Sequence, residues 1–164
     1  MSGRVKAALG SLVFLLLAPG VIAGLIPWLI THWSPLPPDD ALGALRWTGL
    51  IPIAAGLAVV LEAFARFALE GLGTPAPLAP TRILVVSGFY RFVRNPMYLA
   101  VAAMIFGQAV LFASWGVAGY GVVIAVVFDT FVRVYEEPTL GEAYGDEYAA
   151  YRAAVPRWIP RFRH

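Results

Sequence analysis

The sequence predicts an all-α integral membrane protein with four transmembrane helices, a lid loop and a C-terminal interfacial helix. Of its 164 residues, 60% are hydrophobic and 13% are charged, about half the charged fraction of roughly 25% that is typical of soluble domains. Uncharged runs long enough to cross a bilayer recur along the chain, and most arginines flank them on one side. Because the length suits one domain, we expect a single membrane domain over residues 1–164.

The first predicted span covers residues 9–30, which carry no charge. At about 1.5 Å per residue, a helix of this length crosses a hydrocarbon core of about 30 Å. Arg4 and Lys6 would also suit the start of a signal peptide, but the uncharged run exceeds the roughly 7 to 15 residues of a signal-peptide core. A retained helix is therefore favoured, and Pro19 and Pro27 are expected to bend it.

Three further spans are predicted from the remaining apolar runs. The second covers residues 47–69. The 34 uncharged residues between Arg94 and Asp129 are too many for a single crossing. They predict a tight helical hairpin of two short spans, residues 97–113 and 117–135.

The connection over residues 71–95 separates the second span from the hairpin. It is rich in Pro and Gly, with an apolar run at 83–86. Connections longer than about 12 to 15 residues are commonly functional lids or linkers. The apolar run favours a docked lid on the cytoplasmic side, and a re-entrant or interfacial packing segment is the alternative.

A helix is predicted over residues 138–155, on the cytoplasmic face of the bundle. Tyr144, Tyr148 and Tyr151 recur at helical spacing within it. Such a stripe is more typical of packing than of chemistry, because tyrosine rings supply apolar area with one wet end. The tail over residues 156–163 mixes aromatic and basic side chains, as an interfacial anchor does.

The distribution of basic residues and the rarity of Cys and His exclude several classes of function. Positive-inside counting leaves only Arg46 on the far side, so both termini are expected in the cytoplasm. The basic residues flank spans instead of forming a stripe among aromatics, which argues against nucleic acid. The chain has no Cys, and its two histidines, His32 and His164, lie at opposite ends. We therefore expect no disulfide, no Cys nucleophile and no metal site.

This topology brings several charged residues together at the cytoplasmic boundary. Six of them lie in or beside spans and face Arg91 and Arg94: Glu62, Arg66, Asp129, Arg133, Glu136 and Glu137. Charged residues in a span cost about 2.5 to 3.5 kcal/mol on insertion scales and commonly line a cavity. The cluster therefore predicts a pocket. The alternative is that Glu62 with Arg66, and Asp129 with Arg133, are simple i,i+4 pairs at helix ends.

Two features of this cluster call for partners of opposite charge. Glu136 and Glu137 are adjacent carboxylates near a helix C-terminus, so something cationic should face them. Asn95 is a suitable N-cap and Pro96 a suitable first helical residue. A helix N-terminus next to Arg94 suits a carboxylate or phosphate. The alternative is a plain helix cap with Arg94 reaching lipid phosphate.

Two strings of sequence carry a resemblance to a known family. They are LVVSGFYRFVRNPMYLA, residues 84–100, and EEPTLGEAYGDEYAAYRAAVPRWIP, residues 136–160. Together they resemble the isoprenylcysteine carboxyl methyltransferases and the related phospholipid methyltransferases, which are small membrane enzymes that use S-adenosylmethionine. The resemblance runs from about Gly73 to Pro160 and leaves out the first span.

The resemblance implies a set of site residues. Those expected to bind S-adenosylmethionine are Ile83, Leu84, Val85, Tyr90, Asn95, Pro96, Met97, Tyr98, Glu136 and Glu137, with Glu136 at the cationic end of the cofactor. Candidates for a catalytic role are Arg94, Tyr98 and Arg133. Many members have His where this chain has Asn95, and Asn does not titrate near neutral pH.

The expected function is methyl transfer to a lipophilic, membrane-associated acceptor. Methyl transfer is an in-line displacement in which positioning supplies much of the acceleration. An amine or phenol acceptor would need a base, for which Glu62, Asp129 or a tyrosine are candidates. The alternatives are a sterol-reductase-like membrane oxidoreductase with a nicotinamide cofactor, and a non-enzymatic small membrane subunit.

Overall fold

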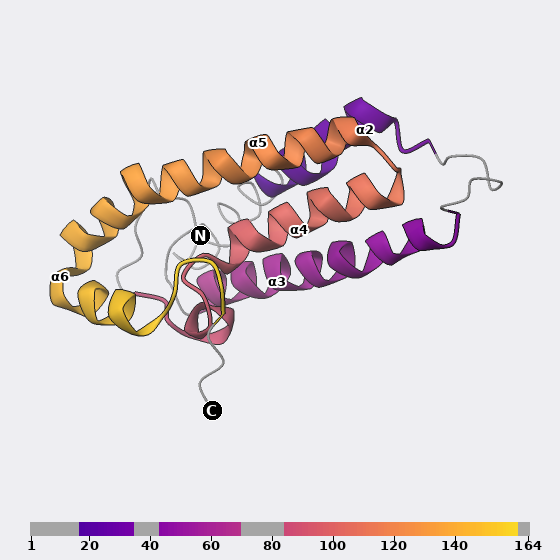
Figure 1. The fold of residues 1–164 in the computed structure, drawn as a ribbon. Helices are drawn as coiled ribbons and strands as arrows, with labels where there is room; N and C mark the ends of the chain where they lie inside the picture. The colour runs from indigo at the N-terminus through magenta and orange to yellow at the C-terminus, as the bar shows by residue number, and fades with distance from the viewer. Residues whose placement is uncertain (1–16, 35–42, 70–83, 161–164) are drawn as a thin grey trace, which may run out of the picture.

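The computed structural model describes residues 17–34, 43–69 and 84–160, and Figure 1 shows their arrangement. In these ranges the chain forms helices and their connections without a strand, which confirms the all-α class. The elements, in chain order, are the π-helical turn η1 (Val21–Leu25), α2 (Ile26–Thr31), the 3₁₀ turn η2 (Leu45–Gly49), α3 (Leu50–Leu69), the 3₁₀ turn η3 (Gly88–Arg91), α4 (Pro96–Leu111), α5 (Trp115–Phe131), the π-helical turn η4 (Val132–Glu136) and α6 (Glu137–Ala154).

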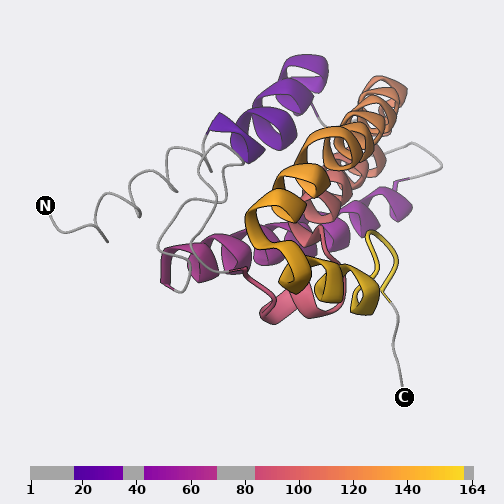
Figure 2. The ribbon, with the colours of Figure 1, turned by 90° about the vertical axis from the view of Figure 1, so that its left-hand side faces the viewer.

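Helix α4 lies at the centre of the bundle. It packs between α3 and α5, and α2 lies against α5, as the two views of the ribbon show (Figures 1 and 2). The approach of α3 to α4 depends on small residues, because a Cβ at Gly56 would collide with the carbonyl oxygen of Ala100. A Cβ at Gly107 would likewise collide with the backbone of Gly49.

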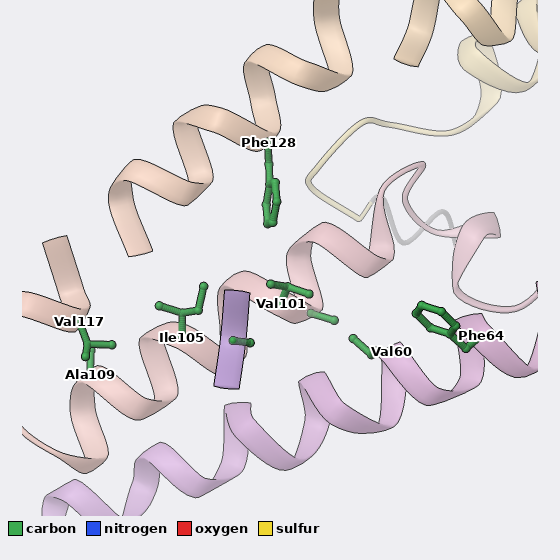
Figure 3. Close-up of a cluster of buried hydrophobic side chains, with 9 residues drawn as sticks. Val60, Phe64, Val101, Ile105, Ala109, Val117 and Phe128 are labelled. Carbon is green, nitrogen blue, oxygen red and sulfur yellow. The ribbon is translucent and has the colours of Figure 1, made fainter. Parts of the chain in front are cut away.

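The hydrophobic core joins α3, α4 and α5. Figure 3 shows Val60 on α3, Val101 and Ile105 on α4, and Phe128 on α5 pointing into one cluster. Val60 and Ile105 are almost fully buried. The outward side chains of the same helices are also apolar, and Val126 on α5 is 61% exposed. A bundle with apolar side chains both inside and outside is expected in lipid.

Two helical stretches in the described ranges are long and apolar enough to cross a membrane. They are Leu45–Arg66 and Trp115–Ala154, while Val21–Thr31 and Pro96–Leu111 are shorter apolar helices. The first predicted span, residues 9–30, is only partly visible, because residues 9–16 lie outside the described ranges.

The predicted hairpin is present, with its turn slightly displaced. Helix α4 ends at Leu111 and α5 begins at Trp115, two residues before the predicted start. Ala113 adopts a positive φ of 45° in the turn. Ser114 then caps α5, since its hydroxyl oxygen accepts a hydrogen bond of 3.2 Å from the N–H of Val117.

The helix predicted over residues 138–155 differs from the structure in two ways. The helix does not start afresh after Pro138, because α5 continues through η4 into α6. The second difference is a break at Gly145, where φ is 53° and ψ is −123°. Only glycine adopts such a backbone readily. The break turns the second half of α6 back toward the bundle (Figure 1).

Candidate active site

A pocket lies at the end of the bundle where α4 begins and η4 meets α6. Its cavity volume is about 100 Å³, below the roughly 300 to 1,000 Å³ that is usual for small-molecule sites. Residues from three segments line it: Leu84, Val85, Tyr90, Arg94, Asn95, Met97, Tyr98, Glu136, Leu140, Tyr144 and Tyr151.

Tyr98 and Glu136 form the hydrogen bond that joins the two sides of this pocket. The Tyr98 hydroxyl donates to Oε2 of Glu136 at 2.7 Å. The Tyr98 ring packs on Phe128, with the ring centroids 4.7 Å apart. Among the described residues, Glu136 makes no ion pair. Its carboxylate is therefore oriented by a phenol and not neutralised by a cation.

Glu137, the next residue, has the opposite kind of environment. It is buried, and both of its oxygens accept from Arg157, with Nε–Oε1 at 2.7 Å and Nη2–Oε2 at 2.8 Å. Nη1 of Arg94 lies 3.1 Å from the same Oε1. The cation expected opposite the adjacent glutamates is therefore a pair of arginines, and both face Glu137.

The turn η3 carries Tyr90 into the pocket. Gly88 begins this turn with a φ of 58°, and the Tyr151 hydroxyl donates to the Tyr90 carbonyl at 2.6 Å. Burial raises the pKa of Tyr90 above its ordinary value, and the nearby charge of Glu136 adds to the rise. The Tyr90 side chain is therefore a neutral phenol across the physiological pH range.

A C-terminal strap, residues 155–160, folds back over the start of α4. The N–H of Arg94 donates to the Pro156 carbonyl at 2.9 Å. The side-chain amide of Asn95 donates to the Arg157 carbonyl at 3.2 Å. Asn95 stands at the N-cap position, but its side chain makes no capping hydrogen bond. The expectation that Asn95 caps α4 through its side chain is therefore wrong, because the strap engages that side chain.

Most residues that the resemblance implied for the cofactor lie at one pocket. Those that line it are Leu84, Val85, Tyr90, Asn95, Met97, Tyr98 and Glu136. Pro96 is buried as the first residue of α4, and Glu137 lies beside the pocket in its ion pairs. Ile83 falls outside the described ranges, as does the rest of the predicted lid loop up to residue 83.

The three residues expected to have a catalytic role do not lie in one cavity. Arg94 and Tyr98 line the pocket, whereas Arg133 lies in a neighbouring groove with its side chain 57% exposed. There Arg133 binds Asp129 at 2.7 Å, and the Trp158 indole donates to Asp129 at 2.8 Å. Tyr98 lines both cavities, so the groove and the pocket meet at this residue.

The predicted cluster of charges is divided into separate groups. Glu62 and Arg66 form an ion pair on α3, and Arg66 also donates to the Ser87 hydroxyl at 3.0 Å. With Arg91 they line a depression on the other side of η3. Asp129 and Arg133 form their own i,i+4 pair. For these two pairs the structure supports the simpler interpretation, namely i,i+4 pairs near helix ends.

Sequence reasoning missed several members of this site. Tyr144 and Tyr151 were assigned to packing, but both line the pocket. Arg157 and Trp158 were assigned to an interfacial tail, but both bind acids near the pocket. The helical spacing of the tyrosines is visible in the sequence, whereas the break at Gly145 that precedes Tyr151 is not.

Comparison with known proteins gives the family. The model of the phospholipid methyltransferase family matches residues 44–147, which is more than half of the chain and includes most of the pocket. No curated protein matches the chain. The chain therefore belongs to the phospholipid methyltransferase family, and it is a membrane methyltransferase.

Proposed function

We propose that this chain transfers a methyl group from S-adenosylmethionine to a lipophilic acceptor in the membrane, with the cofactor held in the pocket between Tyr98, Glu136 and Arg94. The observation that carries the proposal is the pairing of Tyr98 with Glu136 in a pocket that Arg94 also lines. The family supports methyl transfer as the reaction.

The residues of the pocket fit this cofactor. Glu136, which lacks an ion pair among the described residues, suits an ammonium group. Nε of Arg94 is buried and has no hydrogen-bond partner in the described structure, so it suits a carboxylate. Tyr90, Tyr144 and Tyr151 line the pocket, and aromatic rings suit an adenine ring and a sulfonium.

The chain itself supplies orientation. When bound, the cofactor supplies a methyl carbon activated by a sulfonium. Tyr98 holds the Glu136 carboxylate in one direction, and the strap holds the start of α4. Orientation of this kind converts an encounter of two molecules into a positioned displacement. A thiolate or carboxylate acceptor then needs no base.

The groove between α4 and α5 offers the acceptor a route from the bilayer. Its walls include Leu99, Ala102 and Phe128, and its polar end holds Asp129 and Arg133. Because Tyr98 lines both the groove and the pocket, an acceptor lying along α4 would approach the cofactor at Tyr98. A tail would then stay in lipid while the reacting group reaches the pocket.

The membrane topology is part of this proposal. We infer one membrane domain with four crossings, both termini in the cytoplasm and the cofactor pocket on the cytoplasmic side. The position of Arg46 at the opposite end from Arg94 supports this orientation. Helix α4 has 16 residues, fewer than the roughly 20 of an ordinary span, so its crossing requires local thinning of the bilayer, snorkelling of flanking side chains or association with other helices.

Binding of S-adenosylhomocysteine to the detergent-purified chain tests the proposal. We expect micromolar binding by titration calorimetry, lost in Glu136→Gln. Glu142→Gln, which removes an exposed carboxylate of α6 outside the pocket, is the matched control and should bind as the parent does. If the parent fails to bind in both detergent and lipid nanodiscs, the proposal is wrong. Binding of a reduced nicotinamide nucleotide instead would indicate an oxidoreductase, and binding of neither would indicate a structural subunit.

A further inference from the structure

We propose that Arg157 is a positioning residue that occupies Glu137 and thereby keeps Arg94 available to an anionic group of the ligand in the pocket. The inference rests on the proposed function, because it takes that group to be the carboxylate of the cofactor. It concerns the strap, which lies beyond residues 44–147 that match the family.

Two arginines compete for one buried carboxylate. Arg157 engages both oxygens of Glu137, at 2.7 Å and 2.8 Å, in the two-pronged geometry that guanidinium and carboxylate groups favour. Arg94 reaches one oxygen of Glu137 through Nη1, at 3.1 Å, and the same nitrogen lies 3.5 Å from the Tyr148 hydroxyl. Arg94 therefore makes fewer and longer contacts with Glu137 than Arg157 does.

Arg94 is left with one N–H donor, Nε, that has no acceptor in the described part of the chain. Its side chain is only 9% exposed. A buried donor left unsatisfied destabilises the fold, so such a donor in the wall of a pocket indicates a ligand acceptor. Arg94 lines the pocket, and its Nε is the group we assign to the ligand carboxylate.

The strap places the Arg157 guanidinium next to the carboxylate of Glu137. The Pro156 and Arg157 carbonyls accept from the backbone of Arg94 and the side chain of Asn95. The same contacts that hold the strap on the start of α4 thus bring the Arg157 guanidinium to Glu137. Without that guanidinium, both oxygens of Glu137 would be available to Arg94. The guanidinium of Arg94 would then turn so that Nε, as well as Nη1, faces Glu137 and points away from the pocket.

The affinities for two ligands that differ only in the amino-acid part distinguish a positioning role of Arg157 from a purely structural role. S-Adenosylhomocysteine carries the carboxylate, and 5′-methylthioadenosine has the same adenosine and thioether without it. For Arg157→Gln we expect S-adenosylhomocysteine to bind about tenfold more weakly or worse, the loss of one charge-assisted hydrogen bond. Binding of 5′-methylthioadenosine should stay the same. Arg157→Lys, which keeps the charge without the two-pronged contact, should give an intermediate loss.

The control is Arg152→Gln, which removes an exposed positive charge of α6 whose field also reaches Glu137. It should leave both affinities unchanged. Equal weakening of both ligands in Arg157→Gln, or no weakening of either, would overturn the positioning role while the proposed function stands. Failure of the parent to bind either ligand would overturn both. If Arg157→Gln does not fold, Arg157→Lys carries the test, with the same difference between the two ligands as its criterion.

Discussion

The side-chain amide of Gln108 on α4 donates a hydrogen bond of 2.6 Å to the backbone carbonyl of Ala23 in η1. That carbonyl lies four residues before Pro27, and proline has no N–H to return to it. A buried carbonyl without a donor would be costly in a membrane protein, where water is scarce. Gln108 is itself buried, and it supplies the missing donor from a distant helix.

Replacing Gln108 by leucine should destabilise the protein through this carbonyl. We expect Gln108→Leu to lower the free energy of unfolding by about 1 to 3 kcal/mol, measured by thermal or denaturant unfolding in detergent. Adding Pro27→Ala restores an N–H for the Ala23 carbonyl. The double variant should therefore recover part of the loss. An additive effect of the two substitutions would contradict this account.

A second carbonyl of the same helix is satisfied in the same way. The Ile26 N–H bonds to Val21 in the π-helical pattern, which removes the usual donor from the Ile22 carbonyl. The Tyr120 hydroxyl on α5 donates to it at 2.9 Å. We expect Tyr120→Phe to destabilise the protein by about 0.5 to 1.5 kcal/mol and to leave S-adenosylhomocysteine affinity unchanged. A change in affinity would connect this end of the bundle to the pocket, against the prediction.

The hydroxyl of Tyr98 should matter separately from its ring. Tyr98→Phe keeps the packing against Phe128 but removes the donor to Glu136. We expect S-adenosylhomocysteine to bind about tenfold more weakly, as for the loss of one hydrogen bond to a charged group. Titration calorimetry measures this effect. Tyr98→Leu removes both the hydroxyl and the ring, so it should bind S-adenosylhomocysteine more weakly than Tyr98→Phe does and should also be less stable. Equal affinities of Tyr98→Phe and the parent would show that the hydroxyl does not orient Glu136.

Gly88 is the position in η3 where a side chain should be least tolerated. Its φ is 58°, and a Cβ there would collide with the ion pair of Glu62 and Arg66. The left-handed conformation alone costs a non-glycine residue about 1 to 2 kcal/mol. We expect Gly88→Ala to lower both stability and S-adenosylhomocysteine affinity, because η3 carries Tyr90 into the pocket.

Gly119 on α5 provides the comparison for this substitution. A Cβ at Gly119 would have no neighbour within 4 Å, and alanine in a helix interior is favoured over glycine by roughly 0.5 to 1 kcal/mol. Gly119→Ala should therefore raise the melting temperature slightly and keep the affinity of the parent. If Gly88→Ala behaved like Gly119→Ala, the close approach of η3 to α3 would not be needed for the site.

Local patterns in the sequence were sufficient for the elements of the bundle. Long apolar runs predicted α3, α4 and α5, because apolar helices are recognised by composition and length alone. Pro96 began α4 as expected, because proline suits the first helical turn. Seven residues implied by the resemblance line one pocket, six of them because residues 84–98 turn around the start of a single helix.

The tertiary structure alone decided which polar groups meet. Arg157 reaches Glu137, and Gln108 reaches Ala23, across 20 and 85 residues of chain. No periodicity encodes such partners, because each depends on where backbone groups are left unsatisfied after the helices pack. The break at Gly145 is of the same kind, since glycine permits a turn without requiring it. The amino-acid pattern is enough to indicate a membrane methyltransferase built of helices, whereas packing brings Arg157 to both oxygens of Glu137 and Arg94 to one of them.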